Sequence, residues 1–107
     1  MKAMTGAELI AAERQRQVED EGWTAKHDST HRAGELAAAA LCYISHGHPV
    51  QFRVLDFDEV WPWDRYWWKP SKNGIRNLVK AGALIAAEID RLQREEKRHA
   101  ELVRKAQ

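Results

Sequence analysis

The sequence of 107 residues holds a single cysteine, Cys42, which excludes an intramolecular disulfide and a zinc site built from several thiolates. Cys42 lies in the run Ala-Ala-Leu-Cys-Tyr-Ile, and we expect a buried thiol that packs as a small apolar side chain. No apolar run approaches the roughly 20 residues of a membrane-spanning helix, and the first residues lack the apolar stretch of a signal peptide. These absences predict a cytoplasmic protein without a membrane partner.

An excess of either charge is also missing, because 17 Lys and Arg residues stand against 16 Asp and Glu residues. Proteins that follow the phosphates of duplex DNA usually carry a basic excess, so nucleic acid is not an expected partner. The sequence further lacks a phosphate-binding P-loop, a Gly-x-Gly-x-x-Gly fingerprint and a serine nucleophile elbow. We therefore expect neither a cofactor nor a catalytic residue, which favours a binding protein over an enzyme.

Helix signals dominate the first half of the chain. Thr5 and Glu8 have the spacing of a capping box, which predicts a first helix over about residues 6–20. A second helix is expected to start within residues 29–33, where capping residues are dense, and to continue to about residue 45.

The third helix has the most regular pattern, with a cap expected at Ser71 or Asn73. If it continued to Lys105, it would be about 45 Å long at about 1.5 Å per residue, more than the expected width of so small a domain. We therefore expect one domain over residues 1–92 and a charged helical extension over residues 93–107, which either projects into solvent or packs on another subunit.

These patterns predict a mainly α fold, a small bundle of three principal helices with a long tryptophan-rich loop. The alternation of apolar and polar residues over residues 50–54 also allows a short β pair.

Four of the five tryptophans lie within the eight residues from Trp61 to Trp68. Pro62 and Pro70 fix φ and remove backbone donors, so we expect a stiff loop instead of a regular helix or a central strand. Indole faces beside cationic groups suit a planar, negatively charged ligand such as a nucleotide. The alternative is that the indoles fill a core whose helices are rich in alanine. The residues expected at a ligand site are Arg14, Gln17, Trp23, His27, His31, Trp63, Arg65, Trp67, Trp68, Lys69, Lys72 and Arg76.

Several of these residues also have a structural interpretation. Arg14 and Gln17 either face a polar pocket between helices or are partly exposed and pair with nearby glutamates. His27 and His31 are four residues apart and have the spacing of a metal-binding pair, but no third ligand follows at a suitable distance. They either contact a phosphate or a base edge, or His31 helps to cap the second helix. Lys72 and Arg76 flank the expected start of the third helix, where an anion is favoured.

An enzymatic alternative depends on carboxylate pairs. Small all-helical nucleotide pyrophosphohydrolases bind magnesium through Glu-x-x-Glu and Glu-x-x-Asp on facing helices. Glu35 follows Gly34 as in part of such a motif, but alanines occupy residues 37–40, where its acidic partner would lie. Glu88 and Asp90 point to different faces of their helix, so a four-carboxylate site is not complete.

The chain resembles a family of small phage and prophage proteins over about residues 12–92. The matching stretches are residues 12–17, 21–24, 27–28, 31, 34–37, 61–63, 67–70 and 78–89. A weaker similarity is to the RyR domain, the module repeated in ryanodine receptors and found singly in bacteria and phages. Gly22, Trp23 and Asp28 fit its core pattern, and residues 72–79 fit its later helix, whereas the insertion at residues 50–61 and the tryptophan-rich loop depart from it.

The resemblance implies a RyR-like fold and, because some bacterial RyR-like domains are associated with nucleotide signalling, a nucleotide ligand. We therefore predict a phage-encoded, non-enzymatic protein that sequesters a nucleotide, such as a cyclic immune signal, in an anti-defence role, and that forms a homo-oligomer. One alternative is a MazG-like nucleotide pyrophosphohydrolase. Another is a protein-binding module that acts on a host protein through the tryptophan patch.

Overall fold

A computed structural model describes residues 3–46 and 56–107 of the chain. The fold is mainly helical, as the sequence predicts, and the described residues contain no strand. The three principal helices are α1 (Gly6–Asp20), α3 (Glu35–Ser45) and α5 (Gly74–Lys105). Two single-turn helices, α2 (Ala25–Asp28) and α4 (Phe57–Val60), and the 3₁₀ turn Arg65–Trp67 lie between them. The strand allowed at residues 50–54 lies outside the described residues.

Helix α1 has the predicted bounds and the predicted capping box. The amide of Thr5 donates to Glu8 Oε1 at 2.9 Å, and the amide of Glu8 donates to Thr5 Oγ1 at 3.2 Å. Both bonds satisfy amides that the first helical turn leaves without a partner. The chain leaves the helix through Gly22, whose φ of +75° favours glycine.

The second helix was expected too early, because α3 begins at Glu35 and the expected start at residues 29–33 is wrong. The hydroxyls of Ser29 and Thr30 donate to the carbonyl oxygens of Ala25 and His27, so these two residues close α2 instead of opening α3. Gly34 then adopts a φ of +81°, and the chain changes direction at this residue before α3 starts.

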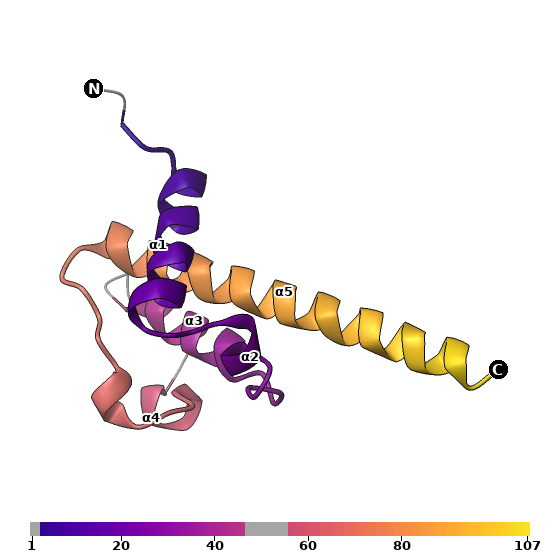
Figure 1. Ribbon diagram of the computed structural model, residues 1–107. Coiled ribbons are helices and arrows are strands. Elements are labelled where there is room, and N and C mark those ends of the chain that lie inside the picture. The colour runs from indigo at the N-terminus through magenta and orange to yellow at the C-terminus, as the bar shows by residue number, and fades with distance from the viewer. Residues whose placement is uncertain (1–2, 47–55) are drawn as a thin grey trace.

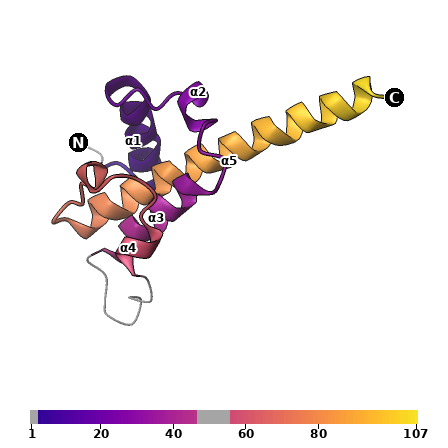
Figure 2. The same cartoon turned by 90° about the horizontal axis from the view of Figure 1, so that it is seen from below.

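Helix α5 begins where the sequence places it. Asn73 Oδ1 accepts hydrogen bonds from the amides of Ile75 and Arg76, so Asn73 and not Ser71 is the cap. The helix is 32 residues long, and its second half extends past every other element (Figures 1 and 2). The longest dimension of the molecule, 53 Å, follows from this extension.

The core lies between α3 and α5, with α1 packed across α5 (Figure 1). Cys42 is 3% exposed, which confirms the predicted buried thiol, and burial raises the pKa of that thiol. Trp61 is also buried, so one indole of the tryptophan-rich loop belongs to the core. The other buried apolar residues of this cluster are Leu36, Ala39, Ala40, Tyr43, Ala81, Leu84 and Ala87.

Helix α1 approaches α5 closely at Gly82. A Cβ atom at Gly82 would lie 2.6 Å from Cδ1 of Ile10 and 2.8 Å from its Cγ1, so the missing side chain makes room for Ile10.

Within residues 3–46 and 56–107, no helix is both long enough and apolar enough to span a bilayer.

Candidate functional site

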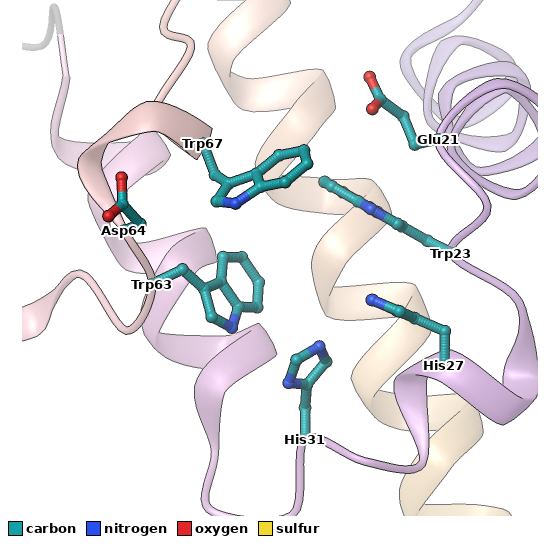
Figure 3. A pocket seen from close by; sticks show the side chains of 7 residues that line it. All are labelled: Glu21, Trp23, His27, His31, Trp63, Asp64 and Trp67. Carbon is teal, nitrogen blue, oxygen red and sulfur yellow. The ribbon is translucent and has the colours of Figure 1, made fainter.

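A pocket of about 390 Å³ opens between the α1–α2 turn, the α2–α3 segment and the tryptophan-rich loop (Figure 3). This volume falls within the roughly 300–1,000 Å³ of typical small-molecule sites. The side chains in its wall come from segments far apart in the sequence: Glu21, Trp23, His27, His31, Trp63, Asp64 and Trp67. Five of the seven were expected at a ligand site.

Trp23 is held in place through its backbone. Its amide donates to the carbonyl oxygen of Gln17 at 2.9 Å, and its carbonyl oxygen accepts from Arg14 Nη1 at 3.1 Å. Arg14 also donates through Nη2 to Asp28 Oδ2 at 2.6 Å, and the Asp28 side chain is 1% exposed. Arg14 therefore joins α1, the turn after it and α2, which fixes one wall of the pocket.

The two histidines continue this wall. The ring of His27 stacks on Trp23 with 6.4 Å between centroids and 7° between planes. The His31 ring meets His27 edge-on at 4.9 Å and lies 5.1 Å from the ring of Trp63. His31 Nδ1 lies 3.4 Å from Glu35 Oε2, an i,i+4 contact that orients the imidazole. The four rings form a continuous aromatic surface (Figure 3).

The opposite wall belongs to the tryptophan-rich loop. Trp63 packs edge-on against Trp61 at 5.4 Å, and its Nε1 is buried with no hydrogen-bond partner within the described residues. Trp67 is 46% exposed and faces Trp23 across the pocket (Figure 3). Lys69 Nζ lies 5.7 Å from the Trp67 ring centroid, a cation–π distance.

The ionisable groups in the pocket wall, apart from the histidines, are the carboxylates of Glu21 and Asp64. Neither was expected from the sequence, although each is close to a tryptophan in the chain. Asp64 Oδ1 accepts from the amide of Tyr66 at 2.7 Å, and Glu21 Oε1 accepts from Arg16 Nη1 at 3.1 Å. The two carboxylates favour hydrogen-bond donors on a ligand, and the Nε1 of Trp63, which has no partner among the described residues, favours an acceptor. Within the part of the chain that the structure describes, the wall contains no lysine or arginine.

A smaller recess of about 40 Å³ adjoins the pocket and shares Glu21, Trp23 and Trp67 with it. Its wall holds three cations, Arg16, Lys69 and Lys80, and two carboxylates, Glu13 and Glu21, which leaves an excess of one positive charge. Burial lowers the pKa of Lys80, and the nearby positive charge of Arg76 lowers it further. An anion in this recess would relieve both effects.

Gln17 also contributes to the recess and is 2% exposed. Its Nε2 donates to Glu13 Oε2 at 3.3 Å, while its Oε1 is buried with no partner within residues 3–46 and 56–107. A buried acceptor without a partner is costly, and a ligand donor would satisfy it. Gln17 pairs with a glutamate as the structural interpretation expects, but it is buried instead of partly exposed, and it lies at a polar recess.

The other residues expected at the site lie outside the larger pocket. Trp68 packs in the aromatic part of the core, 4.7 Å from the Tyr43 ring. Arg65 pairs with Asp58 on the surface, and Lys72 is exposed. Arg76 donates to Glu13 Oε1 at 2.5 Å.

The described residues contain no group of three or more His, Cys, Asp or Glu side chains arranged to hold a metal ion. Glu35 Oε1 accepts from the amide of Ala33 at 2.6 Å, and Glu88 accepts from Arg91 at 2.5 Å. Two of the three carboxylates considered for a magnesium site are therefore engaged with neighbouring groups.

The chain matches no protein-family model, no curated protein and no solved structure. Its function is therefore inferred from the chemistry of the pocket.

Proposed function

We propose that this protein binds a nucleotide without converting it, with the base in the aromatic pocket and the phosphate in the adjoining recess. The observation that carries the proposal is the wall of three indoles and two imidazoles around about 390 Å³. Stacking of a base on an aromatic side chain contributes about 1–3 kcal/mol per base. A space between Trp23, Trp63 and Trp67 offers such faces on several sides of a flat ring.

The carboxylates select among bases. Glu21 and Asp64 accept hydrogen bonds and repel acceptors, so the favoured base carries an exocyclic amino group, as guanine, adenine and cytosine do. Asp64 also disfavours phosphate in the aromatic pocket, whereas Glu21 borders both the pocket and the recess. The phosphate instead lies toward Arg16, Lys69 and Lys80 in the recess.

The proposed biological role is sequestration. Tight binding without turnover removes a nucleotide, for example a cyclic immune signal, from the cytoplasm of the host of a phage that encodes this protein. This role needs a closely fitting pocket and no catalytic group. The resemblance to small phage proteins and to the RyR domain supports this role.

Self-association is part of the proposal, because α5 carries an apolar stripe that no described element covers fully. Five side chains that are 42–65% exposed follow at intervals of three, seven, four and three residues, with Gly82, where Ile10 of α1 packs, in the long interval: Ile75, Leu78, Ile85, Ile89 and Leu92. Apolar residues at this spacing are typical of helices that pair side by side. A second copy of α5 is the occupant that we propose for the stripe.

Two measurements test nucleotide binding. Small molecules released by heating the purified protein are identified by mass spectrometry, and tryptophan fluorescence and melting temperature are followed during titration with a nucleotide panel. We expect one nucleotide to be released, to quench the fluorescence and to raise the melting temperature. The proposal is wrong if no nucleotide changes the fluorescence or the melting temperature. Magnesium-dependent release of pyrophosphate from a nucleotide would instead identify the protein as a nucleotide pyrophosphohydrolase.

A further inference from the structure

A second pocket, of about 130 Å³, lies on the other side of the α2–α3 segment from the aromatic pocket. Its wall consists of Ser29, Arg32, Arg91, Arg94, Glu95 and Arg98. The volume is below the roughly 300–1,000 Å³ of sites for drug-sized ligands, so it suits a small group. His27 and His31 contribute to the aromatic pocket, whereas Ser29 and Arg32 of the same segment contribute to this one.

Two of the arginines are positioned by hydrogen bonds. Arg94 Nη2 donates to the carbonyl oxygen of Ala25 and to Ser29 Oγ, both at 3.2 Å, so it joins α5 to α2. The Arg91 side chain is 6% exposed and donates to Glu88 and Glu95. The hydrogen bonds from Arg91 to Glu88 raise the pKa of Arg91, which therefore stays charged.

Positive charge is in excess at this pocket. Four guanidinium groups and the carboxylate of Glu95 lie in its wall. Glu88 lies outside the wall and forms an ion pair with Arg91. Four positive charges less two negative charges leave an excess of two. Arg32 Nε is 4.0 Å from Glu95 Oε1 and Arg98 is exposed, so both retain donors for a ligand.

We propose that this arginine pocket is a second binding site, independent of the nucleotide site, for a phosphate-sized dianion. A phosphate monoester carries about −1.5 to −2 charges at pH 7, which matches the excess. The N–H donors of arginine form a planar fork that matches the oxygen atoms of phosphate. Arginine is therefore the side chain best suited to bind phosphate. Arg94, which Ala25 and Ser29 hold in place, adds a fixed guanidinium group on the α2 side. Free phosphate and the phosphate of a small ester share this chemistry.

Isothermal titration of the full chain with inorganic phosphate tests the proposal, with chloride at equal ionic strength as the blank. We expect saturable one-to-one binding that Arg98→Gln and Arg32→Gln each weaken at least fivefold. Arg104→Gln is the matched control, because Arg104 is exposed on the same helix outside the pocket, and it should bind phosphate as the parent protein does. Equal binding by the parent and both pocket variants would overturn the proposal.

Further titrations distinguish the possible phosphate ligands and test whether the two sites are independent. Tighter binding of glycerol phosphate than of inorganic phosphate would support a small phosphate ester as the ligand. Trp67→Ala should leave phosphate binding unchanged, and its loss in that variant would overturn the independence of the two sites. Binding of a single-stranded oligonucleotide that exceeds phosphate binding and disappears in Arg98→Gln would overturn the small-anion assignment in favour of a nucleic acid backbone.

Discussion

Arg76, in the first turn of α5, donates to Glu13 of α1 at 2.5 Å, and the Glu13 residue is 2% exposed. Arg16 donates to the same carboxylate through Nε at 2.8 Å and Nη2 at 2.9 Å. Burial alone would raise the pKa of Glu13, but the hydrogen bonds from Arg16 and Arg76 outweigh it and lower the pKa below 4.5. This ion pair connects α1 and α5, two of the helices that border the smaller recess.

Replacing Glu13 with glutamine should destabilise the fold. The amide keeps the shape but loses the charge-assisted bonds to two arginines, each worth about 1.5–3 kcal/mol when buried. Because both arginines are more than a third exposed and can be solvated, we expect a total loss of about 1–3 kcal/mol. Urea denaturation measures it, and Glu19→Gln, an exposed change on the same helix, should cost less than about 0.5 kcal/mol.

The same carboxylate predicts part of the acid sensitivity. Because the pKa of Glu13 is lower in the folded protein, its stabilising contribution is complete above about pH 4.5 and is lost as the pH falls through the folded-state pKa. Urea unfolding between pH 6 and pH 3 should show a smaller acid loss for Glu13→Gln than for the parent protein. Parallel pH curves for the two proteins would contradict this role.

Gly82→Ala tests the crossing of α1 and α5. Alanine gains about 1 kcal/mol of helix propensity over glycine, but overpacking costs about 1–3 kcal/mol, and the new Cβ would lie 2.6 Å from Ile10 Cδ1. We expect net destabilisation by about 1 kcal/mol in thermal or urea unfolding. The second change Ile10→Ala should remove the overlap, so the double variant should be more stable than the sum of the single effects predicts. Additive effects would show that the contact is unimportant.

The stripe on α5 predicts how the chain associates. Ile89→Glu places a charge on the stripe at an isoleucine that is 51% exposed and should shift the protein to monomer in light scattering after gel filtration. Lys97→Gln changes the net charge by the same single unit at an exposed position outside the stripe. This variant should form an oligomer of the same molar mass as the parent protein. If the parent protein is monomeric at high concentration, the proposed pairing is wrong.

Asp64 is expected to determine base preference. Asp64→Asn retains an oxygen that can accept from the amide of Tyr66, so the turn should persist. The asparagine side chain no longer repels hydrogen-bond acceptors on the base. The difference in binding free energy between amino-bearing bases and uracil should therefore shrink by about 1–2 kcal/mol. Competition binding with nucleosides measures the gap. An unchanged gap in a folded variant would show that Asp64 does not contact the base.

Helix spacing and capping carried most of the fold prediction. The bounds of α1 and the Asn73 cap of α5 follow from local hydrogen-bonding chemistry, which the sequence contains in full. The start of α3 does not, because Ser29 and Thr30 are equally suited to close one helix or to open the next. The left-handed Gly34 decides between these outcomes, and its conformation depends on tertiary packing.

The aromatic wall was predictable and its electrostatics were not. Trp23, Trp63 and Trp67 stood out by residue type, and long-range packing brings them to one pocket. The cations Arg65 and Arg76 are near the tryptophans in sequence, but their partners Asp58 and Glu13 lie elsewhere in the chain. Glu21 and Asp64 contribute to the pocket wall instead, which only the three-dimensional arrangement determines. Trp61 and Trp68 follow the alternative interpretation, since they fill the core.

The most direct test of nucleotide binding in the aromatic pocket is isothermal titration of the parent protein, Trp67→Ala and Tyr66→Ala with the nucleotide that the parent retains. Trp67 faces the pocket, whereas its neighbour Tyr66 is 72% exposed and lies outside the pocket wall, so the two variants remove similar aromatic surface from adjacent positions. We predict that Trp67→Ala weakens binding by about 1–3 kcal/mol, which is about 5-fold to 150-fold in affinity, and that Tyr66→Ala binds as the parent does. Equal affinities for all three proteins would contradict the proposed site.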